Sequence, residues 1–451
     1  MSRRLFGTDG IRGLAGQTPL TPELALSLGR AVAHRFRHGH VRPQVVVGRD
    51  TRLSCDMLES AFCAGLCAAG ADVVRLDVIP TPAVALLTRE LGAAAGAMIS
   101  ASHNPFYDNG IKLFGQDGFK LSDDEEHALE AGIDSPEVQH FHVTGAELGR
   151  IMPGAHHSET YLAHLRRAVA SGTNLEGMRI VVDVGYGAAY ALARPLFEGL
   201  GADVICLHDD PDGLNINQHS GALHPEALQA AVKAHKAQLG VALDGDADRL
   251  ILVDETGALR DGDACMALCA HALQAEGKLP GNTVVATQMS NLGLELFLAK
   301  RGIALVRTQI GDRYVVQSLR ENGFALGGEQ SGHLIFLDHA TTGDGLLAAL
   351  RVASILQTRR LPLSRLVQDL TLYPQVLLNV RLKHRKPLES LPSVMDAIEA
   401  TQRLLGEKGR VLVRFSGTEP LARVMIEGQE LTQIQRLAAD IADAIARELG
   451  H

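Results

Sequence analysis

Residues 45–50, Val-Val-Val-Gly-Arg-Asp, form a short apolar run that ends in a glycine and two charged residues. A run of this length, ended by a turn, is typical of a buried strand. A helical stretch follows, and then a second strand-like run, Ala-Gly-Ala-Asp-Val-Val-Arg-Leu-Asp, at residues 69–77. This order predicts two parallel strands joined by a right-handed helical crossover.

The same order occurs twice more along the chain. Strand-like runs at residues 180–185 and 201–207 flank a second helical stretch, and runs at 283–287 and 301–306 flank a third. One such unit is weak evidence, but repetition of the order indicates related domains. The sequence therefore predicts three related, mixed α/β domains.

The pattern changes from residue 371 onward, where a smaller α+β domain is predicted. Its expected elements are strand 376–382, helix 391–405, strand 410–414, strand 422–427 and a final helix from residue 431. The expected domains are residues 1–155, 156–256, 257–368 and 369–451, and each carries one of the polar loops described below.

Composition narrows the class of protein. The chain has 451 residues, of which 46% are apolar and 21% charged, as in soluble globular proteins. No apolar run is long enough to span a bilayer and the N-terminus lacks the apolar core of a signal peptide, so we expect a cytoplasmic protein without a membrane partner. A net charge of −9 argues against nucleic acid as a partner, so an anionic substrate needs a local cluster of positive groups. The sequence leaves a homodimer open.

A polar loop at residues 98–114, Met-Ile-Ser-Ala-Ser-His-Asn-Pro-Phe-Tyr-Asp-Asn-Gly-Ile-Lys-Leu-Phe, joins two strand-like segments. Ser102 lies at its bend, and an ordinary turn explains serine, proline and glycine there. A turn does not explain the additional density of His103, Asp108 and Lys112. Ser102 is interpreted as a nucleophile. Because the Gly-x-Ser-x-Gly elbow of hydrolases is absent, a serine that accepts a phosphoryl group is weighed against one that accepts an acyl group.

Three carboxylates alternate in a second loop, Asp-Gly-Asp-Ala-Asp-Arg at residues 244–249. An EF-hand does not fit, because Arg249 stands where that loop needs glycine. A solvated hairpin turn is the other alternative. Because like charges this close repel one another unless a cation neutralises them, Asp244, Asp246 and Asp248 are predicted to bind a metal ion with oxygen ligands.

Two further loops have the composition of substrate-binding segments. Residues 327–333, Gly-Gly-Glu-Gln-Ser-Gly-His, crowd Glu329, Ser331 and His333 together. Carboxylates and hydroxyls of this kind bind sugar hydroxyls, although a hairpin turn explains the glycines, and His333 is either a proton shuttle or a structural histidine. Arg-Phe-Ser-Gly-Thr-Glu-Pro at residues 414–420 reads as an anion cradle or as a solvated loop.

These motifs resemble those of the alpha-D-phosphohexomutase superfamily. The similarity includes Ala-Ser-His-Asn-Pro at residues 101–105, the aspartate loop, and the two substrate loops in the expected order. Phe-Gly-Thr-Asp-Gly-Ile-Arg-Gly at residues 6–13 and Gly-Glu-Gln-Ser-Gly-His at 328–333 most closely resemble the phosphoglucosamine mutase branch. The resemblance covers essentially the whole chain and implies four domains around a central cleft.

The resemblance assigns roles to the motif residues. It implies that Ser102 is a phosphoserine that lends its phosphate to a sugar phosphate, and that Mg²⁺ is held by Asp244, Asp246, Asp248 and the phosphoserine. The candidates for catalysis or charge support are Ser102, His103, Lys112, Arg12, Arg249 and His333. The candidates for substrate binding are Glu329 and Ser331 for the sugar and Arg414, Ser416, Gly417, Thr418 and Arg423 for the non-reacting phosphate.

The implied activity is that of an isomerase, an intramolecular phosphotransferase that interconverts glucosamine 6-phosphate and glucosamine 1-phosphate. Glucosamine or glucose 1,6-bisphosphate would serve as intermediate and activator, and the product would supply UDP-N-acetylglucosamine for peptidoglycan precursors. A phosphoglucomutase or phosphomannomutase of the same superfamily is the first alternative. A magnesium-dependent sugar phosphatase and a non-catalytic sugar-phosphate binding module also remain open.

Overall fold

The computed structural model describes residues 5–7, 9–37, 42–169, 172–384, 386–415 and 420–450. The chain forms two compact units. One comprises Met1–Thr287 with Val306–Val367, and the other comprises Gln288–Leu305 with Gln368–His451. Within the described residues, no helix combines the length and the apolarity needed to cross a membrane.

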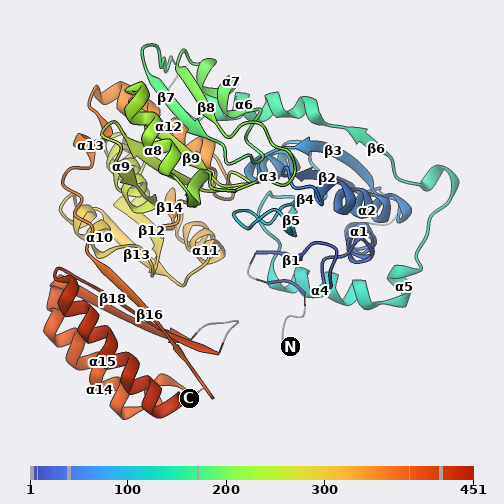
Figure 1. The fold of residues 1–451 in the computed structure, drawn as a ribbon. Coiled ribbons are helices and arrows are strands. Elements are labelled where there is room, and N and C mark those ends of the chain that lie inside the picture. Colours follow the sequence, from blue (N-terminus) through green and yellow to red (C-terminus); the bar gives the residue numbers. More distant parts are fainter. Residues whose placement is uncertain are drawn as a thin grey trace. The chain divides into compact units, whose positions relative to one another are not determined.

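The first α/β domain is built on a six-stranded mixed sheet (Figure 1). Its elements are β1 (Ile11–Leu14), α1 (Pro22–Phe36), β2 (Gln44–Arg49), α2 (Cys55–Ala68), β3 (Asp72–Val78), α3 (Thr81–Glu90), β4 (Ala95–Ile99), β5 (Asp108–Gly115), α4 (Asp123–Asp134), α5 (Pro136–Gln139) and β6 (Ile151–Pro153). The strand order is β1-β5-β4-β2-β3-β6. β2 runs parallel to β3, as the repeat predicts, and also to β4, whereas β5 turns back antiparallel to β4.

Helices α1 and α2 pack closely against each other because glycine lies at their contact. α1 begins after Thr21, whose hydroxyl accepts the Leu24 N–H at 3.3 Å, and ends at Phe36. A Cβ atom at Gly65 of α2 would overlap the Leu26 carbonyl oxygen of α1. The two helices, with the apolar strands, form the buried core of this domain.

The second α/β domain has a five-stranded sheet of order β11-β10-β9-β7-β8. Its elements are α6 (Ser158–Arg167), β7 (Arg179–Asp183), α7 (Ala193–Glu198), β8 (Asp203–Leu207), α8 (Glu226–His235), β9 (Leu239–Leu243), β10 (Leu250–Asp254) and β11 (Leu259–Arg260). β7 is parallel to β8 and β9, while β9 and β10 are antiparallel. The hairpin between β9 and β10 carries the aspartate loop.

The third α/β domain has a four-stranded sheet of order β13-β12-β14-β15. Its elements are α9 (Gly262–Ala275), β12 (Thr283–Thr287), β13 (Ala304–Thr308), α11 (Asp312–Asn322), β14 (Leu326–Gly328), β15 (Leu334–Phe336), α12 (Gly345–Arg359) and α13 (Leu363–Leu366). β12 and β14 are parallel, and β14 and β15 are antiparallel. The short β14–β15 connection is the predicted sugar loop.

The second unit contains a three-stranded antiparallel sheet of order β16-β18-β17. Its elements are α10 (Leu292–Ala299), β16 (Gln375–Arg381), α14 (Pro392–Leu405), β17 (Gly409–Phe415), β18 (Leu421–Gly428) and α15 (Leu431–Leu449). In α15, Ile434, Leu437, Ile441 and Ile445 recur every three or four residues and are buried against the sheet. The predicted fold class, three mixed α/β domains and a smaller α+β domain, is confirmed.

Candidate active site

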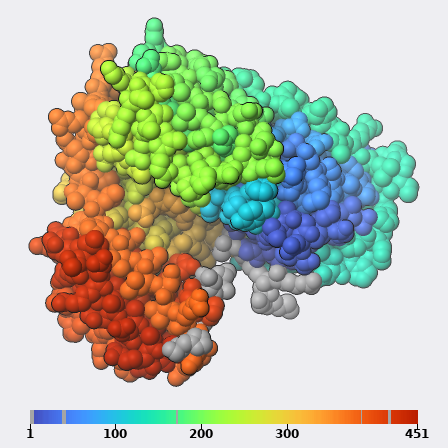
Figure 2. Space-filling model, in the orientation of Figure 1, coloured from blue at the N-terminus to red at the C-terminus, as the bar shows by residue number. Residues whose placement is uncertain are grey.

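Ser102 lies in the loop between β4 and β5, next to the aspartate loop of the second domain. Its Oγ donates a hydrogen bond to Asp244 Oδ2 at 2.6 Å, and Ser102 is only 1% exposed. Its backbone φ of 53° lies in the left-handed region, which a serine rarely adopts. Figure 2 shows the cyan atoms of the segment that includes β5 beside green to yellow-green atoms of the second domain. The fold thus brings the predicted nucleophile and a predicted metal ligand together.

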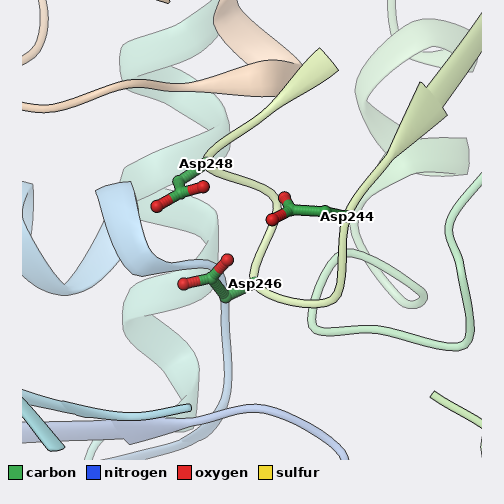
Figure 3. A group of neighbouring side chains, drawn as sticks. All are labelled: Asp244, Asp246 and Asp248. Atoms are coloured by element: carbon green, nitrogen blue, oxygen red, sulfur yellow. The ribbon is translucent and has the colours of Figure 1, made fainter. Parts of the chain in front are cut away.

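The three aspartates of the β9–β10 hairpin converge on one point (Figure 3). Asp244, Asp246 and Asp248 are buried, and each offers a carboxylate oxygen within 4.8 Å of the others. Among the described residues, Asp246 Oδ1 and Asp248 Oδ1 are buried and have no hydrogen-bond partner. Buried carboxylate oxygens without partners are costly unless a cation uses them, so the group could hold a metal ion.

Different surroundings shift the pKa values of Asp244 and Asp248 in opposite directions. Burial and the charges of Asp248 and Asp246 raise the pKa of Asp244 well above its ordinary value. Burial also opposes ionisation of Asp248, but Lys112 and His333 outweigh it and hold the pKa of Asp248 well below its ordinary value. One carboxyl of the group therefore resists ionisation until further positive charge arrives.

Lys112 supplies positive charge from inside the protein. Its side chain comes from β5, is 2% exposed, and places Nζ 2.8 Å from Asp246 Oδ2 and 3.3 Å from Asp248 Oδ2. Burial would lower the pKa of Lys112, but Asp246, Asp9 and Asp248 outweigh it and raise that pKa well above its ordinary value. Lys112 is therefore a fixed cation of the site.

Three other predicted residues surround Ser102. His103 Nδ1 lies 3.4 Å from Ser102 Oγ. Burial and the nearby Arg249 and Arg12 lower the pKa of His103 to about 4, so its imidazole is neutral near pH 7. Arg249 Nε lies 3.9 Å from Asp248 Oδ1, and Arg12 donates to a carboxylate oxygen of Asp9 and, at 3.5 Å, to the carbonyl of residue 101. The structure brings all three predicted side chains to one site.

His333 lies between two carboxylates. Its Nδ1 is 3.7 Å from Asp248 Oδ1 and its Nε2 is 3.4 Å from Asp312 Oδ2. The Gly343 N–H donates to Nε2 at 3.0 Å, which is compatible with the neutral tautomer that carries its proton on Nδ1. Burial would lower the pKa of His333, but Asp248 and Asp312 outweigh it and raise that pKa. The loop position predicted from sequence thus puts His333 beside the aspartates.

The predicted sugar loop is hydrogen-bonded to β10 at the residue that directly follows the aspartate loop. The Leu250 N–H donates to the Gly332 carbonyl at 3.1 Å. Within the sugar loop, Ser331 Oγ donates to Glu329 Oε2 at 3.3 Å, and Gly311 N–H donates to Glu329 Oε1 at 3.2 Å. Burial would lower the pKa of Arg249, but Asp248, Asp244 and, to a smaller extent, Glu329 outweigh it and raise that pKa.

The predicted phosphate loop belongs to the second unit. Arg414 on β17 and Arg423 on β18 are direct cross-strand partners. Burial and the charge of Arg423 lower the pKa of Arg414, so two like charges meet here. Such a pair favours a bound anion. The predicted residues Ser416, Gly417 and Thr418 lie outside the described residues.

Several charged or polar residues of the site were not predicted. Lys120 Nζ donates to Asp312 Oδ2 at 2.6 Å and to a carboxylate oxygen of Asp9, which also contacts Lys112. Thr81, the first residue of α3, donates its hydroxyl to Asp246 Oδ2 at 2.6 Å. Asp9 and Asp312 fall in glycine-containing stretches that could have marked them, whereas Lys120 and Thr81 carry no local signal and arrive only through tertiary structure.

Family models match the chain in all four domains. Those described as Phosphoglucomutase/phosphomannomutase, alpha/beta/alpha domains I, II and III, match residues 3–140, 159–257 and 261–373. The model described as the Phosphoglucomutase/phosphomannomutase C-terminal domain matches residues 377–444. The order of the four matches is that of the structural domains.

Individual proteins match along the full length. The chain is 52% identical to a phosphoglucosamine mutase of Symbiobacterium thermophilum, over 99% of each chain, and 49% identical to one of Nitratidesulfovibrio vulgaris (strain DP4), over 100% of each. A crystal structure of a phosphoglucomutase/phosphomannomutase family protein from Burkholderia thailandensis superposes with a TM-score of 0.80 at 28% identity, covering 98% of this chain and 99% of that one. The chain therefore belongs to the phosphoglucomutase/phosphomannomutase family and is a phosphomutase enzyme.

Proposed function

We propose that the enzyme interconverts glucosamine 6-phosphate and glucosamine 1-phosphate through a phosphorylated Ser102. The observation that carries the proposal is the 2.6 Å contact between Ser102 Oγ and Asp244, at the edge of three convergent aspartates. The choice of glucosamine over glucose or mannose rests on the curated relatives, which are phosphoglucosamine mutases at about half identity over the whole chain.

The buried oxygens of Asp244, Asp246 and Asp248 fit a hard divalent cation, and we assign Mg²⁺ to them with a phosphoserine oxygen. Bound there, Mg²⁺ would withdraw charge from the phosphoryl group and make it a better donor. The protein contributes fixed charges to the same end. Lys112 and Arg249 approach the aspartates, so they limit the negative charge that a phosphate on Ser102 would meet.

In the first half-reaction, the bond between phosphorus and Ser102 Oγ breaks as a bond forms between phosphorus and the free hydroxyl oxygen of the sugar phosphate. The sugar hydroxyl gives up its proton to a base of the site, and Ser102 Oγ, as it leaves phosphorus, receives a proton in return. Among the predicted side chains, His103 is suited to exchange this proton, because its neutral imidazole lies 3.4 Å from Ser102 Oγ. Lys112 is engaged by carboxylates and instead supplies charge.

The product of this step is a 1,6-bisphosphate, which must turn end for end before the serine recovers the other phosphate. The bisphosphates of glucosamine or glucose are thus the proposed intermediate and activator. Glu329 and Ser331 are assigned to sugar hydroxyls. Arg414 and Arg423, with the loop residues Ser416, Gly417 and Thr418, are assigned to the phosphate that is not reacting. The cross-strand pairing of the two arginines supports this assignment.

The proposal is tested by intact mass spectrometry after incubation with glucose 1,6-bisphosphate. We expect the parent enzyme and a Ser122→Ala control, which changes a helix-capping serine remote in sequence, to gain one phosphoryl group. Ser102→Ala should gain none and should lose mutase activity almost completely. A parent enzyme that turns over glucosamine 6-phosphate without ever carrying phosphate on Ser102 would contradict the mechanism.

A companion assay compares the 6-phosphates of glucosamine, glucose and mannose, and measures inorganic phosphate. Conversion of glucosamine 6-phosphate with a higher kcat/KM than the other two sugars supports the proposed substrate. Faster conversion of glucose or mannose phosphate would assign the enzyme to another branch of the family. Net release of inorganic phosphate without sugar 1-phosphate would indicate a phosphatase.

A further inference from the structure

Arg52 is a buried arginine three residues after the end of β2, and its guanidinium contacts the backbone of the Ser102 loop. Its side chain is 0% exposed and pairs with Asp50, whose side chain is also 0% exposed. The Arg52 Nε donates to Asp50 Oδ2 at 2.8 Å, and the Arg52 backbone N–H donates to Asp50 Oδ1 at 3.0 Å. The aspartate therefore compensates the buried charge and fixes the plane of the guanidinium.

The remaining nitrogens of Arg52 bind the backbone of the serine loop. Nη2 donates to the carbonyls of Ser102 at 2.9 Å and Asn104 at 2.8 Å. Nη1 donates to the carbonyl of Asp108 at 3.0 Å and to that of Pro105. One side chain thus binds four carbonyls from a seven-residue segment. Together with the bond to Asp50, every N–H donor of the guanidinium is used, which is more than burial of the side chain alone requires.

Two more contacts hold the peptide groups on either side of Ser102. Asp50 Oδ2 accepts from Ser100 Oγ at 2.6 Å, and Ser100 Oγ accepts from the Ser102 N–H at 2.9 Å. Asn217 Nδ2, from the second domain, donates to the Ser102 carbonyl at 2.9 Å and to the Asn104 carbonyl at 3.1 Å. Because Ser102 has the disfavoured left-handed φ, these contacts explain how its backbone is kept there.

We propose that Arg52, oriented by Asp50, is a positioning residue that fixes the direction of the Ser102 Oγ–phosphorus bond during phosphoryl transfer. The inference rests on the proposed phosphoserine mechanism. Phosphoryl transfer needs the entering and leaving oxygens nearly in line, so a small rotation of the loop slows the reaction far more than it weakens substrate binding. Arginine is required because a planar fork can reach carbonyls on two sides, whereas a lysine ammonium is a single point donor.

The test is Arg52→Lys, which keeps the positive charge next to Asp50 but cannot bind all four carbonyls. The enzyme is first phosphorylated with glucose 1,6-bisphosphate, and the phosphoserine is quantified by intact mass. Transfer to glucosamine 6-phosphate is then measured per phosphorylated Ser102, together with KM and the share of phosphate lost to water. We expect transfer to slow at least tenfold, KM to stay within twofold, and the share lost to water to rise.

Arg75→Met is the matched control. Arg75 lies on neighbouring β3 and also pairs with a buried carboxylate, with Nε 2.9 Å from Glu59 Oε2. Its loss should lower the thermal midpoint without changing transfer per phosphorylated Ser102. If Arg52→Lys is not obtained folded, Asn217→Gly decides. Glycine suits the φ of 59° at that position and removes one donor to the Ser102 and Asn104 carbonyls, so a several-fold slower transfer is expected.

The outcomes separate the inference from the mechanism on which it rests. A parent enzyme that takes up no phosphoryl group refutes the phosphoserine mechanism itself. A parent enzyme that is phosphorylated, with folded Arg52→Lys or Asn217→Gly transferring phosphate at the parental rate, overturns the positioning role alone. A merely structural Arg52 would reduce the amount of folded enzyme and leave KM, the rate per phosphorylated serine and the share lost to water unchanged.

Discussion

Replacing Lys112 with methionine removes the internal cation of the aspartate group while keeping a long apolar side chain in the buried space. Nζ is 2.8 Å from Asp246 and 3.3 Å from Asp248, and both partners are buried. Breaking a buried ion pair by removing one partner costs about 3–5 kcal/mol. We therefore expect a lower thermal midpoint for Lys112→Met in the presence of a chelator.

Magnesium binding should change in the opposite direction. Lys112 and a bound divalent cation compete for the same carboxylates, so its loss should tighten Mg²⁺ binding by at least tenfold, about 1.4 kcal/mol. Mg²⁺ affinity is measured by isothermal titration, which avoids treating a multidomain protein as two-state. The matched control is Lys120→Met. Lys120 is largely buried, with 16% of its side chain exposed, but among the described residues it pairs with Asp9 and Asp312 and does not contact the three aspartates.

The reasoning fails if Lys112→Met and Lys120→Met bind Mg²⁺ with the parental affinity, or if both variants tighten binding equally. Equal tightening would mean that general negative charge matters and that contact with the aspartates does not. A thermal midpoint of Lys112→Met equal to that of the parent in chelator would show that the buried carboxyl groups are neutral without the lysine.

Three other predictions follow from separate parts of the structure. Burial raises the pKa of Asp344 to about 6, above its ordinary value of 3.8, so its protonated form is favoured in the folded state. Its contribution to the free energy of unfolding should fall by about 3 kcal/mol as pH rises from about 4 to about 6. Asp344→Asn should therefore make the thermal midpoint depend less on pH over that window. Arg414→Gln should raise KM for glucosamine 6-phosphate about 10- to 100-fold with a smaller change in kcat, because a charged hydrogen bond to a non-reacting phosphate contributes about 1.5–3 kcal/mol in ground and transition states alike; unchanged KM would remove Arg414 from the substrate site. Gly65→Ala should destabilise the first domain by about 1–3 kcal/mol or more, because the added methyl group overlaps the Leu26 carbonyl, and a parental denaturation midpoint would contradict the close contact of α1 and α2.

The strands and loops whose signals lie within a few consecutive residues could be predicted from the sequence. The apolar run at 45–50 became β2, a central strand that is parallel to both of its neighbours. The aspartate loop was recognisable because the like charges of Asp244, Asp246 and Asp248 follow one another within five positions, so their repulsion and their shared ligand are both visible in sequence.

Contacts between distant segments could not be predicted in the same way. Arg52 follows the quoted strand closely, yet nothing in its neighbourhood shows that its guanidinium reaches carbonyls about fifty residues later. Lys120 and Thr81 likewise contact residues of the site that are far away in sequence, and only the folded structure shows these contacts. The ranking of proton donors also needed the structure, because the neutrality of His103 depends on burial and on arginines from two other segments.

The backbone of the aspartate loop is anchored by three other segments of the chain. The Thr81 N–H at the start of α3 donates to the Asp246 carbonyl at 3.0 Å, the Gly345 N–H at the start of α12 donates to the Ala247 carbonyl at 3.0 Å, and the Leu250 N–H binds Gly332. A fragment of residues 156–256 would carry the carboxylates, but Thr81, Gly345 and Gly332 all lie outside it, so it would lack all three anchors. We expect such a fragment to bind magnesium poorly, because the metal loop would lack the neighbouring segments that hold its backbone.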